Sequence, residues 1–146
     1  MTPSRKADYA LRAMLDMALH ARPGRLARTA EIARRTGAPA KFLEAILAEL
    51  RRARLLESRR GAEGGHRLAR TPTRVSAGEI WRAIDGPLSL AERGGGRRRG
   101  ADGPARALGA LWAEVEGAVA RTVDQVTLDD LARRAHEAAG VHDFTI

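Results

Sequence analysis

Arginine and glycine are concentrated in one short stretch of the chain, and this stretch offers the clearest chemistry. Residues 59–67 read Arg-Arg-Gly-Ala-Glu-Gly-Gly-His-Arg. Guanidinium groups bind phosphate oxygens through several N–H donors, and glycines permit positive φ angles and the close approach of another backbone. A ribbon of two short strands is too small to bury much apolar surface, so stability does not explain this composition. The stretch is suited to a phosphate backbone or a minor groove.

The distribution of charge indicates a polyanionic partner. The net charge is +8. Residues 1–75 hold 17 Lys and Arg against 7 Asp and Glu, whereas residues 76–146 hold 9 against 11. Only two of the basic residues are lysines, so a coding bias towards arginine is the alternative explanation. Such a bias would spread arginine over both halves and would not remove acids from the first, so nucleic acid is the favoured partner.

Three helices are expected before the arginine–glycine stretch. The first covers residues 4–20, where apolar residues recur at helical spacing. A short second helix covers residues 29–36, and the third begins at residue 39. The expected caps and stops are Ser4 and Thr29 as N-caps, Gly37 as the stop of the second helix, and Pro39 at the start of the third.

The third helix has two different faces. Its buried face consists of Leu43, Ile46, Leu47 and Leu50, and the other carries Ala40, Lys41, Glu44, Ala45, Ala48 and Arg51. Two short helices joined by a glycine turn, the second with a small or charged outer face, form a helix-turn-helix. Short strands expected at residues 55–58 and 66–68 add a wing. The expected fold is mainly α with a small β-hairpin wing, a winged helix-turn-helix.

The second half of the chain is expected to add two more helices after a loop. A capping box at residues 76–79 begins a helix that ends at Gly86-Pro87. Residues 88–103 contain a triple glycine followed by three arginines and no apolar periodicity, which is typical of a flexible loop. A long amphipathic helix follows over residues 104–126. Thr127 then caps a last helix, and residues 141–146 form an undefined tail.

The composition argues against several classes of protein. The chain has no cysteine, which excludes disulfides and thiolate-held zinc or iron–sulfur clusters. No run approaches the roughly 20 apolar residues that span a bilayer, and the first residues contain no apolar run of the kind found in secretion signals, so none is expected. We therefore expect a soluble, cytoplasmic protein with no membrane partner. No nucleophile elbow, phosphate loop or carboxylate pair indicates an enzyme, and the four histidines show no ligand spacing, so neither cofactor nor metal is expected.

Five stretches match one family over nearly the whole chain. They are residues 6–13 (Lys-Ala-Asp-Tyr-Ala-Leu-Arg-Ala), 31–33 (Glu-Ile-Ala), 42–47 (Phe-Leu-Glu-Ala-Ile-Leu), 60–70 (Arg-Gly-Ala-Glu-Gly-Gly-His-Arg-Leu-Ala-Arg) and 84–88 (Ile-Asp-Gly-Pro-Leu). The Gly-Gly wing followed by Leu-Ala-Arg is the most specific of them. On these residues the chain resembles the IscR–NsrR–CymR family of bacterial transcription regulators.

The resemblance implies a homodimeric, sequence-specific regulator of double-stranded DNA, in the simplest case a repressor. The recognition helix would place Ala40, Lys41, Glu44 and Ala45 towards base edges, the wing would place Arg60 at the minor groove, and Arg51, Arg52 and Arg59 would contact phosphates. Thr29, Gly64, Gly65 and His66 complete the predicted DNA-binding set. Chemistry agrees, because lysine suits guanine and phosphate while glutamate accepts from the cytosine amino group. The alternative for Glu44 is a surface ion pair with Lys41.

The resemblance also implies how the chain is divided. Residues 1–87 would form the DNA-binding domain, residues 88–103 a flexible basic and glycine-rich loop, and residues 104–146 the dimerisation helix and the C-terminal helix. The long helix of one subunit would cross that of the other. The predicted dimer contacts are Leu108, Leu111, Trp112, Val115, Val119 and Thr122.

The chain departs from the family pattern at three places. Residues 89–103 lack the three cysteines that often hold an iron–sulfur cluster in the family. Arg54 replaces the glycine that usually ends the recognition helix, at about 1 kcal/mol of local strain if the left-handed geometry is kept. His66 replaces an aromatic residue after Gly-Gly, and it could make phosphate contact sensitive to pH or be a simple polar substitute.

The signal that controls the regulator has two main candidate sources. One is a small ligand bound between the winged domain and the long helix, near Trp81 and Trp112, although ordinary core packing of these tryptophans is the favoured alternative. The other is a partner protein, with the chain acting as an adaptor. A third, a metal or cluster site built from His, Asp or Glu, is disfavoured because the histidines show no ligand spacing.

Overall fold

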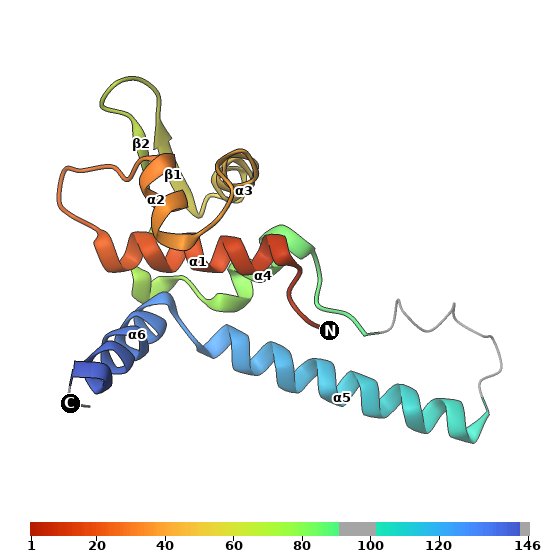
Figure 1. Ribbon diagram of the computed structural model, residues 1–146. Coiled ribbons are helices and arrows are strands. Elements are labelled where there is room, and N and C mark those ends of the chain that lie inside the picture. Colours follow the sequence, from red (N-terminus) through yellow and green to blue (C-terminus); the bar gives the residue numbers. More distant parts are fainter. Residues whose placement is uncertain (91–101, 144–146) are drawn as a thin grey trace.

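The computed structural model describes residues 1–90 and 102–143, and Figure 1 shows the path of the chain. The elements are α1 (Arg5–His20), α2 (Thr29–Thr36), α3 (Ala40–Arg52), β1 (Leu56–Arg59), β2 (Gly65–Leu68), the 3-10 turn η1 (Pro72–Arg74), α4 (Ala77–Asp85), α5 (Gly103–Gln125) and α6 (Leu128–Asp143). The fold class is confirmed: a mainly helical chain with one antiparallel hairpin, arranged as a winged helix-turn-helix. Most of the loop expected at residues 88–103 lies outside the described residues.

Helix α1 is the centre of the core. It packs against α2, α3, α4 and α6, and in Figure 1 it lies between α2, α3 and the hairpin on one side and α6 on the other. The large side chains that are fully buried come from α1, α2, α3, α4 and α6 and from the junction between η1 and α4. They are Met14, Ile32, Leu43, Ile46, Leu47, Leu50, Val75, Ile80 and Leu128. The four apolar residues expected on the inner face of α3 are all among them.

Local hydrogen bonds define most helix starts as predicted. The Ser4 hydroxyl accepts from the Ala7 N–H at 3.0 Å. Ser76 and Glu79 form the expected capping box, and Thr127 forms another with Asp130, in which the Asp130 N–H donates to Thr127 Oγ1 at 3.1 Å. These contacts span three residues, so sequence alone can predict them.

The predicted cap of α2 is wrong. The N-cap is Arg28, which makes no side-chain cap, and Thr29 is the first helical residue. The Thr29 hydroxyl instead lies 3.0 Å from Nε2 of His66 in the wing. A contact with a residue 37 positions away in the sequence has therefore replaced the cap that was expected within α2.

Two other boundaries differ from the expectation. The strands pair Leu56 with Leu68 and Arg59 with Gly65, so β1 begins one residue later than predicted. The reason is that the Leu55 N–H donates to the Leu50 carbonyl at 3.0 Å and closes the end of α3. In addition, α6 continues through residues 141–143, which were expected in an undefined tail; residues 144–146 lie outside the described part.

Arg54 occupies the left-handed position that ends α3. Its φ is 60°, and its N–H donates to the Arg51 carbonyl at 2.9 Å. Together with the Leu55–Leu50 bond this is a Schellman closure, in which glycine is the usual residue. The strain expected from the sequence is therefore present in the fold.

We expect Arg54→Gly to raise the free energy of unfolding by about 0.5–1 kcal/mol, because glycine adopts positive φ without a Cβ clash. Arg52→Gly is the matched control: it removes the same charge from the last helical turn, where glycine costs about 1 kcal/mol. Urea denaturation measures both. A loss of stability in both variants would contradict the strain argument.

No helix in the described part of the chain is both long enough and apolar enough to cross a membrane. The longest, α5, extends away from the body in Figure 1 and contains no buried residue.

Candidate nucleic-acid interface

The outer face of α3 is uncovered. Ala40, Lys41, Glu44 and Ala45 are all exposed, whereas the opposite face is packed on α1 and α4. The turn before α3 is tight because Gly37 ends α2 at a φ of 75°. Among the described residues neither Lys41 nor Glu44 takes part in an ion pair, so the alternative of a Lys41–Glu44 pair receives no support. Both side chains are free to meet a ligand.

The two wing glycines are required by shape. A Cβ on Gly64 would lie 2.3 Å from the Arg59 carbonyl oxygen, and one on Gly65 would lie 2.6 Å from the Ala27 carbonyl oxygen. Gly65 also has a φ of 151°. Gly64 is buried under the turn of the hairpin. The structural role of both glycines is to allow the backbone of the wing to follow this path. Their direct contact with DNA stays a prediction.

His66 ties the wing to the helix-turn-helix. Its Nδ1 lies 2.7 Å from Ser58 Oγ in β1, and its Nε2 lies 3.0 Å from Thr29 Oγ1 at the start of α2. Its backbone exchanges two hydrogen bonds with Ala27, at 2.7 and 2.8 Å. Because both ring nitrogens are used inside the protein, the geometry supports a positioning role for His66 in addition to the predicted contact with DNA.

Burial, and after it the charge of Arg51, lowers the pKa of His66 below its ordinary value. The folded protein therefore favours the neutral ring, and the unfolded chain binds more protons once the pH falls below about 6.5. We expect the free energy of unfolding to fall between about pH 7.5 and about pH 5.5, and to fall less in His66→Gln. His136→Gln, exposed on α6, is the control and should behave as wild type. Identical pH dependence in all three proteins, measured by urea denaturation, would contradict this.

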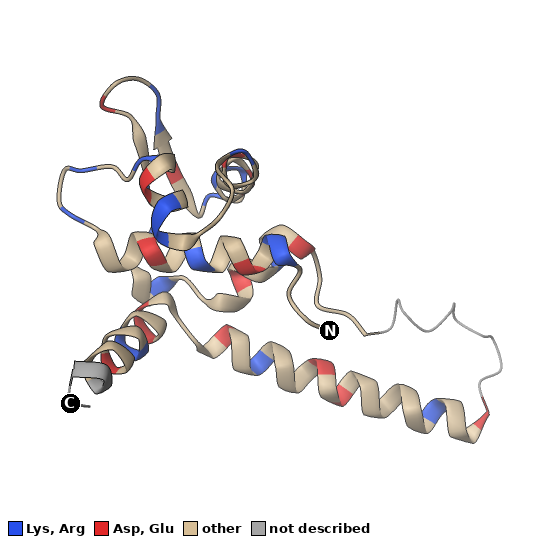
Figure 2. Ribbon diagram, in the orientation of Figure 1, with Lys and Arg blue, Asp and Glu red and all other residues tan. Residues whose placement is uncertain are grey.

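The arginines of the predicted interface have no acidic partner among the described residues. Figure 2 shows basic residues along α3, the hairpin and the segment between α1 and α2. Arg51, Arg52, Arg59 and Arg60 are exposed, and none forms an ion pair with another described residue. By contrast, Arg67 pairs with Glu57 at 2.7 Å. Unpaired guanidinium groups on one side of the molecule are suited to phosphates.

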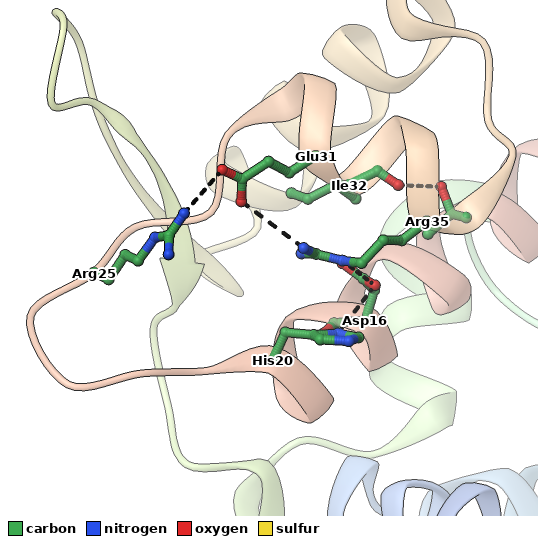
Figure 3. A network of polar contacts seen from close by, with 7 residues as sticks. Asp16, His20, Arg25, Glu31, Ile32 and Arg35 are labelled. Atoms are coloured by element: carbon green, nitrogen blue, oxygen red, sulfur yellow. Dashed lines mark hydrogen bonds and ion pairs between the residues drawn. The ribbon is translucent and has the colours of Figure 1, made fainter. Parts of the chain in front are cut away.

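A buried ion pair that the sequence analysis missed orients the helix-turn-helix (Figure 3). The Asp16 side chain in α1 is only 7 % exposed and accepts two hydrogen bonds from Arg35 in α2, both at 2.9 Å. These bonds raise the pKa of Arg35 further. Glu31 bridges Arg35 and Arg25, and His20 Nδ1 lies 2.9 Å from the Asp16 carbonyl oxygen. The available signal was an aspartate within the apolar pattern of the first helix.

The two tryptophans have different surroundings. Trp81 is buried, and its indole N–H donates to Asp85 at 3.0 Å. It therefore fits the core-packing alternative. Trp112 on α5 is 50 % exposed. The effector pocket expected near them stays a prediction, and the cavity described below is lined by neither tryptophan.

Comparison with known proteins agrees with this geometry. The Rrf2 family model, described as that of an iron-dependent transcriptional regulator, matches residues 3–134. A Mycobacterium tuberculosis H37Rv protein that carries the name of an HTH-type transcriptional regulator is 39% identical over 132 residues, 90% of this chain and 81% of that protein.

Two solved structures have the same fold. CymR of B. subtilis, the global cysteine regulator, superposes with a TM-score of 0.76 at 30% identity, covering 92% of this chain and 98% of the other. IscR of T. potens superposes with a TM-score of 0.76 at 31% identity, covering 94% and 90%. These proteins are regulators rather than enzymes, and the resemblance read from the sequence is confirmed.

Proposed function

Because the chain belongs to the Rrf2 family of transcriptional regulators, we propose that it is a homodimeric repressor that binds a specific DNA site. The observation that carries the proposal is the uncovered outer face of α3 beside Arg59 and Arg60 of the hairpin, which have no acidic partner among the described residues. Such a dimer would repress transcription by occupying a promoter on the bacterial chromosome. The protein would therefore act in the cytoplasm.

Each subunit would dock by α3 and the wing together. In the major groove, Lys41 would donate to guanine and Glu44 would accept from cytosine, while Ala40 and Ala45 would allow the helix to come close. Arg60 would enter the adjacent minor groove. Arg51, Arg52 and Arg59 would bind phosphates. The Thr29 hydroxyl at the start of α2, which His66 holds in place, would lie next to the DNA backbone.

The dimer would form along α5. Leu108, Leu111, Trp112 and Val115 are 53%, 45%, 50% and 36% exposed, and they follow one another at helical spacing on one stripe. A contiguous apolar stripe of this size is unusual on a monomer and typical of an interface. Its continuation includes Val119 and Thr122. A second copy of α5 is the simplest cover, because the stripe is then self-complementary about a two-fold axis.

The C-terminal end of α5 is fixed to the DNA-binding part. Arg82 donates two hydrogen bonds to Asp124, at 2.6 and 2.9 Å, and these bonds lower the pKa of the carboxylate. Gly78 permits this approach, since a Cβ there would lie 2.0 Å from Asp124 Oδ1. The Leu128 N–H also donates to the Val75 carbonyl at 2.9 Å. Dimerisation through residues 104–146 would therefore set the distance between the two recognition helices in domains 1–87, with residues 88–103 as the connecting loop.

An iron–sulfur cluster of the kind held by cysteines does not fit this chain. There is no cysteine in the sequence, and within residues 1–90 and 102–143 no three His, Asp or Glu side chains converge as a metal site. We propose that control comes instead from a small molecule or a partner protein.

Selection of sites from a random duplex library tests the proposal. We expect a pseudo-palindrome whose half-sites are one helical turn or a multiple apart. The logarithm of the affinity for it should fall steeply and linearly with the logarithm of salt concentration. Enrichment of no sequence, or salt-independent binding, would overturn the proposal.

A further inference from the structure

A cavity of about 830 Å³ lies between the wing and the segment of residues 21–27. In Figure 1 this segment lies on the side of the hairpin away from α3. It is open on one side, and its lining comes from the C-terminal end of α1, residues 21–27, α2, both strands of the hairpin and η1. Met17, Leu26, Leu68 and Pro72 give it an apolar lining, and Met17 is 3 % exposed. Cavities that take small organic molecules have about this volume, roughly 300–1,000 Å³. Neither Trp81 nor Trp112 is part of it.

The polar lining of the cavity is strongly basic. It contains five arginines and two histidines but only one acid, Glu31. Three arginines are neutralised by carboxylates: Arg25 by Glu31 at 3.2 Å, Arg35 by Asp16 and Arg67 by Glu57. Figure 3 shows the first two of these pairs. The two other arginines, at positions 22 and 59, form no ion pair with any residue in the described part of the chain.

We propose that this cavity binds a small organic carboxylate with an apolar body, and that its occupation weakens DNA binding. An unpaired guanidinium group offers a carboxylate two parallel N–H donors. Contact with the apolar lining removes the apolar body of the ligand from water, which favours binding. An inorganic anion could use only the guanidinium donors, and a neutral apolar molecule could use only the apolar lining.

The effect on DNA rests on the proposed function, and it follows from the position of Arg59. This residue lines the cavity and is also a predicted phosphate contact at the end of β1. A carboxylate beside it would neutralise a charge that the DNA otherwise uses. The same cavity is lined by His66, which connects β2 to α2. By linkage, DNA should lower the affinity for the carboxylate by the same factor.

Calorimetry with octanoate tests the site itself, with octanamide and inorganic phosphate as comparison probes. We expect octanoate to bind one site per subunit and both comparison probes to bind at least about tenfold more weakly. Arg22→Gln should weaken octanoate about tenfold, since it removes a charge-assisted contact. Arg134→Gln, an exposed arginine on α6, is the matched control and should leave binding unchanged. Equal binding of octanamide or of phosphate, or an unchanged affinity in Arg22→Gln, would overturn the site.

Fluorescence anisotropy with the selected DNA site tests the coupling. Saturating octanoate should weaken DNA binding about fivefold or more and reduce the salt slope by about 0.9 for each neutralised phosphate contact. Arg22→Gln should lose this response. Octanoate binding without any change in DNA affinity would overturn the coupling. Failure to bind any selected DNA in the absence of octanoate would instead count against the proposed function, and the calorimetric result would stand on its own.

Discussion

Leu111→Glu should convert the protein from dimer to monomer and lower its affinity for a complete pseudo-palindromic site by at least about 100-fold. Leu111 lies in the middle of the exposed stripe of α5 and is 45% exposed in the single chain. Burying a leucine stabilises by about 1.5–3 kcal/mol, and the symmetric interface loses it twice. Each introduced carboxylate would also have to give up water without a partner. A 100-fold loss corresponds to only about 2.7 kcal/mol, so the estimate is conservative.

The matched control is Ala110→Glu, which introduces the same charge one residue earlier. Ala110 is exposed and lies on the side of α5 away from the stripe. This variant should remain dimeric and keep its affinity for DNA. Sedimentation equilibrium measures the mass of each protein, and anisotropy measures its DNA affinity. A Leu111→Glu protein that stays dimeric would show that α5 is not the interface, and a monomer with full affinity would show that the DNA site does not require two subunits.

Asp16→Asn should lower the free energy of unfolding by about 2–3 kcal/mol. The substitution keeps the shape of the side chain but removes the charge that holds Arg35, and hydrogen bonds to charged groups contribute about 1.5–3 kcal/mol. Arg35 would remain with its side chain only 26% exposed and without its principal carboxylate. Loss of one partner of a buried pair is much more damaging than loss of an exposed pair.

Asp8→Asn provides the comparison in the same helix. Asp8 pairs with Arg12 at 2.8 Å, but both side chains are more than half exposed. Exposed pairs of this kind contribute about 0.2–1 kcal/mol, so this variant should lose no more than about 1 kcal/mol. Urea denaturation of the two variants and the parent gives the difference directly. Similar losses in both would mean that the buried position of Asp16 is unimportant. DNA binding by Asp16→Asn, measured where it is still folded, should weaken because α2 is no longer held against α1.

Close backbone contacts at the two wing glycines explain why the Gly-Gly stretch was informative in the sequence. Gly64 and Gly65 lie where a side chain would collide with backbone carbonyls of residues 59 and 27. A requirement of this kind restricts the residue type severely, and it therefore stands out in a sequence. The exposed arginines beside them are free of such requirements, so their abundance there indicates a function rather than a constraint of folding.

The sequence by itself determined the elements, their order, most of their caps and the two-faced character of α3. The physical reason is that these features depend on hydrogen bonds and apolar spacings within about four residues. The closures at Ser4, Gly37, Ser76 and Thr127 are of this type. It also determined the family, through short motifs, and the lack of thiolate ligands, through composition.

Only the tertiary structure decided which side chains meet across long stretches of chain. Thr29 contacts His66 instead of capping α2, Asp16 pairs with Arg35, and Arg82 pairs with Asp124. The sequence separations of these three contacts are 37, 19 and 42 residues. The cavity beside the wing is likewise assembled from several separate segments. Periodicity marks which face of a helix turns inward, but the partner on that face depends on how rigid elements pack together, and packing is a property of the whole fold.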